Sequence, residues 1–258
     1  MMRLLSVALL RERVTDWLTY PFVIPAIRTL EKLEFRSRIC FFVGENGSGK
    51  STLLEAIATQ YGFGLEGGGR NFHRQTTESL QSVAPLSKAL RVAFTKRTGK
   101  GFYLRAESFF NVASEVDQMA RDDPASDALA PYGGISLHQQ SHGESFLALL
   151  ENRFFRKGFY VLDEPEAALS PQRQITMLGV LRDLLEDNEE IQFLIATHSP
   201  ILLAYPGAQI FSFDDGVIRE ITYRETNSYQ VMARFLARPE VYIREIFEQG
   251  SSGPDEDA

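Results

Sequence analysis

The stretch that decides the fold of this chain reads Gly44-Glu45-Asn46-Gly47-Ser48-Gly49-Lys50-Ser51. An apolar run at 38–43 precedes it and is typical of a buried parallel strand, and helix-forming residues over 51–60 follow it. The glycines let the backbone curl so that successive N–H groups point inward at phosphate oxygens, and the new helix presents its positive end to the same anion. The spacing therefore predicts a phosphate-binding loop, whereas the alternative is a glycine-rich turn with a chance lysine.

The residues of this loop have separate expected tasks. We expect Lys50 to reach the β- and γ-phosphates and the Ser51 hydroxyl to hold Mg²⁺. The residues expected to surround the nucleotide are Asn46, Gly47, Ser48, Gly49, Lys50, Ser51 and Thr52. An upstream aromatic ring (Trp17, Tyr20 or Phe22) is a candidate for stacking on a nucleotide base, although packing in the core is the commoner role of such rings.

Two more strands are followed directly by groups that suit phosphate chemistry. The apolar strand 159–162 runs into Asp163 and Glu164, where the first carboxylate can hold Mg²⁺ through its water shell and the second can polarise an attacking water. An ordinary strand terminus is the alternative. The apolar strand 192–196 is followed by His198, which we expect at the carboxyl edge of a parallel sheet, within reach of the γ-phosphate or the water. A lone histidine is, however, more often structural.

A second anion-binding arrangement precedes the expected helix 146–155. Ser141 offers a hydroxyl, Gly143 allows close approach, and the helix N-terminus follows. Ser141 and Glu144 also have the spacing of a capping box, and the two interpretations are compatible. Because the chain already has a phosphate-binding loop, this second site could serve a nucleotide that is held by a neighbouring subunit.

Composition limits the classes of protein that the chain can belong to. Its 258 residues suit one large α/β domain, and its net charge of −7 argues against a strong non-specific nucleic-acid binder. The segment 88–105 is locally basic and could form a patch for nucleic acid, but a solvated hairpin edge is the favoured interpretation. A single cysteine, Cys40, excludes an intrachain disulfide and fits a reducing cytoplasm. The longest stretch without charged residues, 191–213, contains Pro200 and Pro206, so we expect no membrane-spanning helix.

The rest of the chain is assigned by pattern. We expect helices over 78–91, 112–121 and 171–186 and at the C-terminal end; strands over 3–10 and 20–25; strands 91–95 and 101–106 joined by a turn at 97–100; a flexible glycine-rich connection over 62–71; and a closing β segment near 209–222. The acidic end, 251–258, is expected to be disordered.

The order of these motifs resembles that of the ABC-type ATPase family. The Walker A match is 44–51, the signature-like match is 141–144, the Walker B match is 159–164, the D-loop-like match is 166–170, and the switch histidine falls at His198. The glutamate at position 144 makes the chain look more similar to the RecF-like, OLD-like and SMC-like branch, and to its small stand-alone ATPases, than to transporter subunits.

The resemblance implies an α/β P-loop NTPase with the ABC-ATPase head fold: a mainly parallel central sheet, an antiparallel β part and a helical subdomain. The expected organisation is a single domain over 1–250, with the helical and signature subdomain at about 108–156, and the tail 251–258. It also implies ATP and Mg²⁺ as ligands and an ATP-dependent head-to-tail homodimer, in which Lys50 of one subunit and Ser141, Gly143 and Glu144 of the other enclose ATP.

The chain departs from the family pattern at several positions. His142 stands where a glycine is usual, and Ser170 stands where transporter D-loops carry aspartate. A clear Q-loop glutamine is missing from the sequence, and Glu107 is the positional candidate for contact with Mg²⁺ or water. The interval between Lys50 and Ser141 holds no long heptad run, so no SMC-type coiled-coil arm is expected.

Three functional hypotheses follow. The first is a cytoplasmic ATPase that dimerises on ATP, opens on hydrolysis and drives an unidentified partner process, with Glu164 and His198 as the catalytic residues. The second is a nucleotide-gated regulatory module in DNA repair or anti-phage defence with slow turnover, for which an effector protein or DNA would be the partner. The third is the ATP-binding subunit of a membrane transporter, ranked last because the glutamine is missing and position 144 is glutamate.

Overall fold

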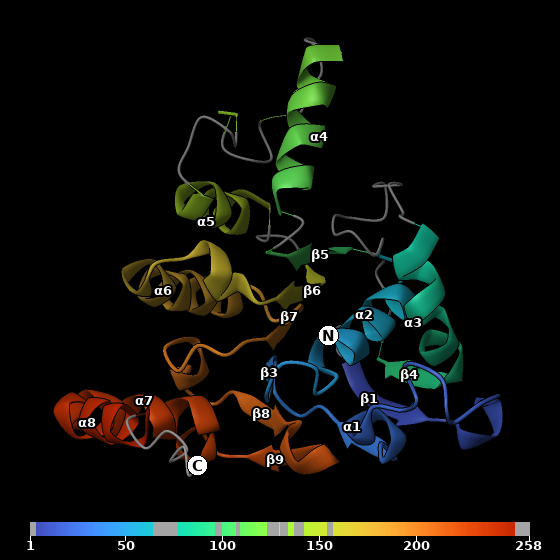
Figure 1. Cartoon of the computed structure of the whole chain (residues 1–258). Coiled ribbons are helices and arrows are strands. Elements are labelled where there is room, and N and C mark those ends of the chain that lie inside the picture. Colours follow the sequence, from blue (N-terminus) through green and yellow to red (C-terminus); the bar gives the residue numbers. More distant parts are fainter. Residues whose placement is uncertain are drawn as a thin grey trace, which may run out of the picture.

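A computed structural model describes residues 4–63, 77–95, 100–106, 109–122, 129, 134–136, 142–153 and 157–250 (Figure 1). The strands are β1 (Leu4–Leu9), β2 (Lys32–Glu34), β3 (Ile39–Val43), β4 (Leu90–Phe94), β5 (Gly101–Arg105), β6 (Gly158–Asp163), β7 (Ile191–Ala196), β8 (Gln209–Ser212) and β9 (Arg219–Ile221). The helices are α1 (Pro25–Arg28), α2 (Lys50–Tyr61), α3 (Thr77–Ala89), α4 (Phe109–Asp122), α5 (His142–Arg153), α6 (Pro171–Asp187), α7 (Asn227–Ala237) and α8 (Pro239–Gly250).

The central sheet has the strand order β5-β6-β7-β3-β8-β9. All neighbouring strands in it are parallel except β8 and β9, which pair antiparallel. Parallel strands that are joined by helices have both faces covered and read as continuous apolar runs, which describes β3, β6 and β7, all fully buried. Because the strands run the same way, the segments that follow β3, β6 and β7 meet at one edge of the sheet.

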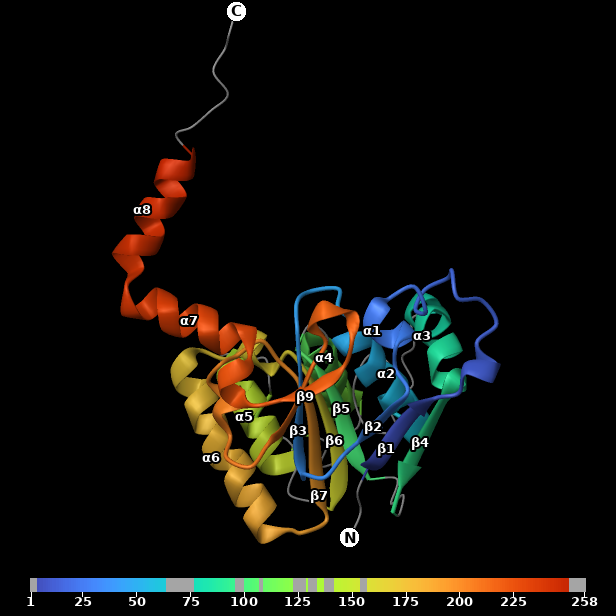
Figure 2. The same cartoon turned by 90° about the horizontal axis from the view of Figure 1, so that it is seen from below.

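The two faces of β3 belong to different parts of the hydrophobic core. Cys40 and Phe42 pack into a cluster with α2, whereas Ile39, Phe41 and Val43 pack into a cluster with α5 and α6. This is the alternation that a strand imposes on successive side chains. Both views place α2 and α3 on one side of the sheet and α5 and α6 on the other (Figures 1 and 2).

A second sheet is antiparallel and has the order β2-β1-β4. The fold class expected from the sequence is thereby confirmed: an α/β P-loop fold with a mainly parallel central sheet, an antiparallel part and helices inserted between β5 and β6. The inserted helices are α4 and α5. Whether they form a subdomain over about 108–156 stays a prediction, and 251–258 lies outside the described residues.

Two local expectations were wrong. The segment 20–25 is not a strand but a series of turns that leads into α1 at Pro25, because Pro21 and Pro25 have no N–H to give to a β ladder. The strands around 97–100 do not form a hairpin, nor a solvated hairpin edge, because β4 pairs with β1 and β5 pairs parallel with β6. Gly101 makes the second pairing possible, since a Cβ there would lie 1.9 Å from the carbonyl oxygen of Phe159.

The C-terminal part holds two helices where the sequence predicts one. Figure 2 shows α7 leaving the body of the molecule and α8 standing clear of it. Among the described residues, none of the helices combines the length and the apolar character needed to cross a membrane.

Candidate functional site

The loop between β3 and α2 depends on three glycines with left-handed backbone. Gly44, Gly47 and Gly49 have φ values of 143°, 79° and 102°, which side chains of other residues rarely allow. Around this curl, Lys50 Nζ donates hydrogen bonds to the carbonyl oxygens of Gly44 at 2.7 Å and Glu45 at 3.0 Å. The loop thus curls around its own lysine, whose ammonium group two loop carbonyls hold in place.

Lys50 carries its charge in a buried position. Its side chain is 4% exposed, and burial lowers the pKa of the ammonium group, while the carboxylates of Glu164, Asp163 and Asp214 oppose that shift. The Oγ atom of Ser48 is buried in the same loop and has no hydrogen-bond partner among the described residues. A buried cation and an unsatisfied hydroxyl in one curled loop favour an anionic ligand that accepts hydrogen bonds from both.

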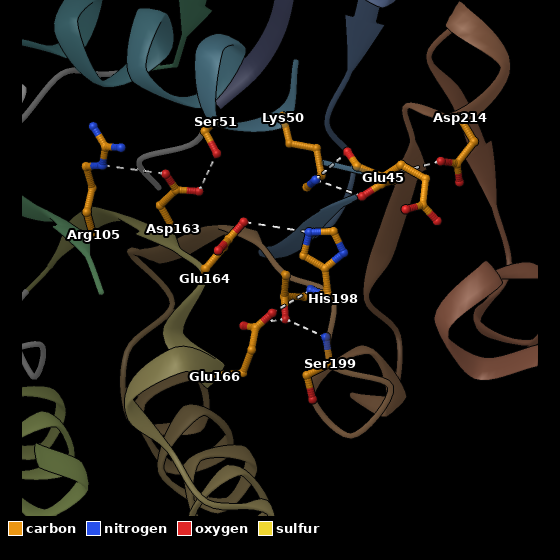
Figure 3. A network of polar contacts seen from close by, with 12 residues as sticks. Glu45, Lys50, Ser51, Arg105, Asp163, Glu164, Glu166, His198, Ser199 and Asp214 are labelled. Carbon is orange, nitrogen blue, oxygen red and sulfur yellow. Dashed lines mark hydrogen bonds and ion pairs between the residues drawn. The ribbon is translucent and has the colours of Figure 1, made fainter. Parts of the chain in front are cut away.

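Ser51 and Asp163 lie side by side below the loop (Figure 3). The Ser51 hydroxyl donates to Asp163 Oδ1 at 3.0 Å, and Asp163 is 5% exposed. Burial raises the pKa of Asp163 to about 6, although Arg105, whose Nε lies 3.8 Å from Asp163 Oδ2, acts against that shift. A hydroxyl next to a poorly solvated carboxylate is a donor set that fits Mg²⁺.

A metal ion at this site would need further oxygens from outside the protein. Within the described residues, no cluster of three or more His, Cys, Asp or Glu side chains is arranged to hold a metal ion by itself. Mg²⁺ commonly needs only one or two carboxylates, because substrate phosphates and waters supply the remaining oxygens. The residues present therefore fit a metal that arrives with a phosphate ligand rather than a closed protein cage.

The raised pKa of Asp163 predicts how stability depends on pH. Between about pH 4 and 6 the folded chain keeps this proton and the unfolded chain loses it, so the stability that the neutral carboxyl contributes is lost as the pH rises through 6. Asp163→Asn removes this term, so it should stabilise the magnesium-free chain more at pH 8 than at pH 5. The expected difference is on the order of 1 kcal/mol, measured by urea unfolding. An equal effect of Asp163→Asn at both pH values would contradict the shift.

Glu164 follows β6 with strained backbone. Its φ and ψ are both 51°, a left-handed conformation that is uncommon outside glycine and that clusters at functional sites. Its N–H donates to the carbonyl oxygen of Ala196 at 2.9 Å, which ties it to the end of β7. The carboxylate is partly exposed and its Oε1 lies 3.6 Å from His198 Nε2 (Figure 3). The structure therefore brings together the two residues that were predicted separately from different strands.

His198 directs its ring toward this carboxylate. Its Nε2 atom is buried and has no hydrogen-bond partner within the described part of the chain. At 3.6 Å the distance between His198 Nε2 and Glu164 Oε1 is longer than a hydrogen bond, so the hydrogen-bonding capacity of Nε2 stays unused by the residues that the structure describes.

Glu166 is a residue of this site that the sequence analysis missed. Its carboxylate accepts hydrogen bonds from Thr197 Oγ1 at 2.7 Å and from the His198 N–H at 2.5 Å. Glu166 therefore fixes the backbone from which the His198 ring projects. The sequence places it in the D-loop-like match, for which no contact partner was predicted.

Glu166→Ala should lower both stability and activity. Two hydrogen bonds to a partly buried carboxylate are lost, so we expect a loss of about 2 kcal/mol in the free energy of unfolding. ATP hydrolysis should fall about tenfold, because the freed His198 backbone lets the ring leave its position. Glu166→Gln keeps an acceptor oxygen and should recover most of the stability. An alanine variant with the wild-type midpoint of urea unfolding would rule this role out.

Two further contacts shape the rim of the loop. The Asp214 carboxylate accepts a hydrogen bond from the Glu45 N–H at 3.1 Å, so the segment after β8 also supports the loop. Tyr20 Oη lies 2.9 Å from Thr52 Oγ1. Of the three aromatic candidates, Phe22 is buried in the core and Trp17 packs against it, whereas Tyr20 is 48% exposed at the rim.

A pocket of about 210 Å³ lies at the loop. Its lining residues are Tyr20, Ile24, Asn46, Gly47, Gly49, Lys50, Ser51, Thr52 and Glu164. Most of the predicted phosphate-binding residues therefore line one cavity together with Glu164. A ring on one wall and a lysine on another suit a ligand that joins an aromatic base to phosphates.

The signature-like segment is described from His142 onward. A Cβ on Gly143 would lie 2.4 Å from Nη1 of Arg173, so this glycine leaves space for the arginine side chain of α6. Glu144 Oε1 accepts a hydrogen bond from Arg173 Nη2 at 2.9 Å. Ser141 and Glu107, which were predicted to contact nucleotide and metal, lie outside the described residues.

Comparisons with known proteins agree with this geometry. Residues 73–203 match the family model described as an AAA ATPase domain, a range that contains Asp163, Glu164 and His198. The thiamine import ATP-binding protein ThiQ of Rhizobium meliloti is 31% identical over 174 residues, which cover 63% of this chain and 69% of that protein.

Two more proteins show the range of the similarity. The ribose import ATP-binding protein RbsA of Burkholderia mallei is 30% identical over 180 residues, which are 64% of this chain and 34% of that protein, so the chain spans about a third of it. Among solved structures, the SMC head domain from Thermotoga maritima aligns with a TM-score of 0.39 and 19% identity, covering 74% of this chain and 92% of that chain.

Proposed function

The chain belongs to the AAA ATPase domain family and is an ATPase of the ABC type, and from this premise we propose that two copies close head-to-tail around two Mg-ATP molecules. Each nucleotide would be bound by the loop of one copy and completed by the signature-like segment of the other, as the sequence resemblance implies. Hydrolysis would then release the second copy, because the γ-phosphate provides contacts that only the closed state makes.

The observation that carries the proposal is the position of the signature-like helix. Helix α2, which begins at Lys50, packs on the sheet face of Cys40 and Phe42, whereas α5 packs on the opposite face with Phe41. In one chain, the helix that begins at the loop and the signature-like helix α5 therefore pack on opposite faces of the sheet. A second copy, turned by a two-fold rotation, can present its α5 to a phosphate in the loop.

Within each site the residues would divide the work. Lys50 and the N–H groups of the loop would bind the β- and γ-phosphates, and Tyr20 would contact the base. Ser51 and Asp163 would hold Mg²⁺, which when bound neutralises charge that develops on the phosphates. Glu164 would accept a proton from the attacking water, and His198, fixed through Glu166, would donate to the γ-phosphate or the water.

Mixing two inactive variants tests the shared site. Lys50→Ala disables the loop, and Ser141→Glu places a negative charge where the partner's phosphate would lie. Each variant alone should hydrolyse little ATP. In a one-to-one mixture, half of the dimers contain both variants, and each mixed dimer has one site that carries both lesions and one intact site. We therefore expect the mixture to recover about a quarter of the wild-type rate, measured as phosphate release.

The control is each variant alone, at the total protein concentration of the mixture. Activity that stays at the level of the separate variants would refute head-to-tail sharing. A Ser141→Glu chain that is fully active by itself would refute the role of Ser141.

Two partner processes are compatible with such a dimer. An effector protein fits the resemblance of the chain to small stand-alone ATPases. Its similarity to thiamine and ribose import ATP-binding proteins favours instead a role as the ATP-binding subunit of an importer. Isolation of the proteins that co-purify with a Glu164→Gln dimer distinguishes them, because an importer subunit would be recovered with a membrane protein.

A further inference from the structure

Helices α7 and α8 expose an unusual amount of apolar surface. Their exposed apolar side chains are Val231, Met232, Phe235 and Leu236 on α7 and Val241, Ile243, Ile246 and Phe247 on α8. Leu236 is 68% exposed and Phe247 is 72% exposed. Figure 2 shows that α8 and the end of α7 project beyond the body of the protein. Several exposed apolar side chains on two adjoining helices indicate a candidate interaction site.

The apolar residues form one stripe on each helix. In α7, Val231 and Met232 are each followed four residues later by another apolar residue, Phe235 and Leu236. In α8, Ile243 is followed by Ile246 and Phe247, three and four residues later, which is the spacing of one helix face. The helices meet at a corner, where the rings of Phe235 and Tyr242 pack with centroids 6.1 Å apart. Helices of 11 and 12 residues are marginal in water without tertiary packing, so a second surface is needed to cover the stripes.

We propose that a second copy of this chain covers them, with α7 of each copy lying against α8 of the other. The charges are complementary in this arrangement. Residues 227–238 contain Arg234 and Arg238 and no acidic residue, whereas the sequence of α8 has Glu240, Glu245 and Glu248 and one basic residue, Arg244. A two-fold interface pairs a basic α7 with an acidic α8 twice, so the surface is self-complementary.

The start of α7 places this interface next to the nucleotide site. Asn227 Nδ2 donates to Glu45 Oε1 at 2.9 Å, and Val231 and Met232 line a pocket of about 300 Å³ together with His198. This pairing would be a second interface of the proposed dimer. It rests on the proposed function, because it assumes that the nucleotide sites of the two copies face each other. It adds a contact that persists without ATP and keeps the two copies at a high effective concentration for closure.

The other possible occupants are less suited to this surface. An anionic membrane attracts amphipathic helices that are rich in lysine and arginine on their polar face, whereas α8 has more glutamate than arginine. An unrelated protein partner would not require α7 and α8 to carry opposite charges.

Charge reversal in the full-length chain tests the pairing. One variant, Arg234→Glu with Arg238→Glu, makes both helices acidic, and a second, Glu240→Arg with Glu245→Arg, makes both basic. Sedimentation velocity without nucleotide should show dimers for the wild type and at least about tenfold weaker dimerisation for each variant alone. An equimolar mixture should restore dimers that contain both variants, because each acidic α7 then meets a basic α8.

Further arms separate this proposal from the head-to-tail one. Leu236→Asp with Phe247→Asp should abolish the nucleotide-free dimer while the body of the chain stays folded, since both side chains are exposed. Lys50→Met should keep that dimer, because the pairing does not need ATP. Both interfaces operate if ATP produces the closed dimer of Glu164→Gln when α7 and α8 are wild type, but not when Leu236→Asp and Phe247→Asp are added. If Glu164→Gln never closes while the mixture still pairs, only the head-to-tail proposal fails.

The pairing itself is overturned by three results. These are a wild type that is monomeric without nucleotide at tens of micromolar, a mixture of charge variants that stays monomeric, and dimers that survive Leu236→Asp with Phe247→Asp. Binding of the monomer to vesicles that contain phosphatidylserine, lost in the same double variant, would assign the stripes to a membrane surface instead.

Discussion

Glu164→Gln is expected to lower the rate of ATP hydrolysis by about 10²–10⁴-fold while ATP binding is retained. The amide has the size of the carboxylate and keeps an oxygen that faces His198, but it cannot accept the proton of the attacking water. The variant also removes a negative charge from the pocket that holds Lys50, so the affinity for ATP should stay the same or rise. Single-turnover hydrolysis and equilibrium binding of labelled ATP, measured on the same preparation, separate the two effects.

The variant is also expected to accumulate as the ATP-bound dimer. Closure needs the γ-phosphate, and a chain that binds ATP without cleaving it stays closed. Light scattering should therefore show a larger species for Glu164→Gln in ATP and Mg²⁺ than in ADP. Asp215→Asn is the matched control, because it removes an exposed carboxylate that follows another strand of the same sheet and should hydrolyse ATP at the wild-type rate. Undiminished turnover in Glu164→Gln would remove this residue from the role.

The sequence was sufficient to predict how Lys50, Glu164 and His198 come together. Each comes after a short, mainly apolar run, and such runs indicate parallel strands whose carboxyl ends share one edge. The observed order β6-β7-β3 makes the three strands direct neighbours. No knowledge of side-chain positions was needed for this inference, because the topology of a parallel sheet fixes which chain ends meet.

Residues that support the site through hydrogen bonds to the backbone could not be predicted from the strand pattern. Glu166 supports the His198 backbone, and Asp214 supports the backbone of Glu45, but an acidic residue near a strand end has many possible acceptor roles. For Asp214 a signal was present, since it follows β8 just as Asp163 ends β6. The sequence analysis expected a β segment near 209–222 but did not predict that it pairs with β3. Without that pairing, Asp214 could not be placed near the loop.

Strand pairing explains the errors in the fold as well. A turn between two β-favouring runs indicates a hairpin when only local sequence is considered. Here β4 pairs with β1, from the beginning of the chain, and β5 pairs with β6, from beyond the inserted helices. Which distant strand completes a sheet is decided by packing across the whole domain, and the residues of the turn carry little information about it.

Lys50→Ala is expected to weaken ATP binding by about 100-fold, because a charged donor to the β- and γ-phosphates is worth about 2–3 kcal/mol. The fold should survive. Burial of the ammonium group opposes its charged state, as the lowered pKa of Lys50 indicates, so removal of the charge also removes an unfavourable desolvation term. The loss of the bonds to Gly44 and Glu45 should offset this gain, and the free energy of unfolding without nucleotide should change by less than about 1 kcal/mol.

Lys50→Met provides the test that separates charge from packing. It keeps the buried aliphatic stem, so a loop that collapses in the alanine variant should stay in place. Both variants should lose ATP binding in calorimetric titration, while Lys32→Ala, which removes an exposed lysine from β2, should bind as the wild type does. If Lys50→Met bound ATP with wild-type affinity, the phosphates would not be held by this ammonium group. The buried ammonium group of Lys50 would then serve a ligand other than the phosphates of ATP.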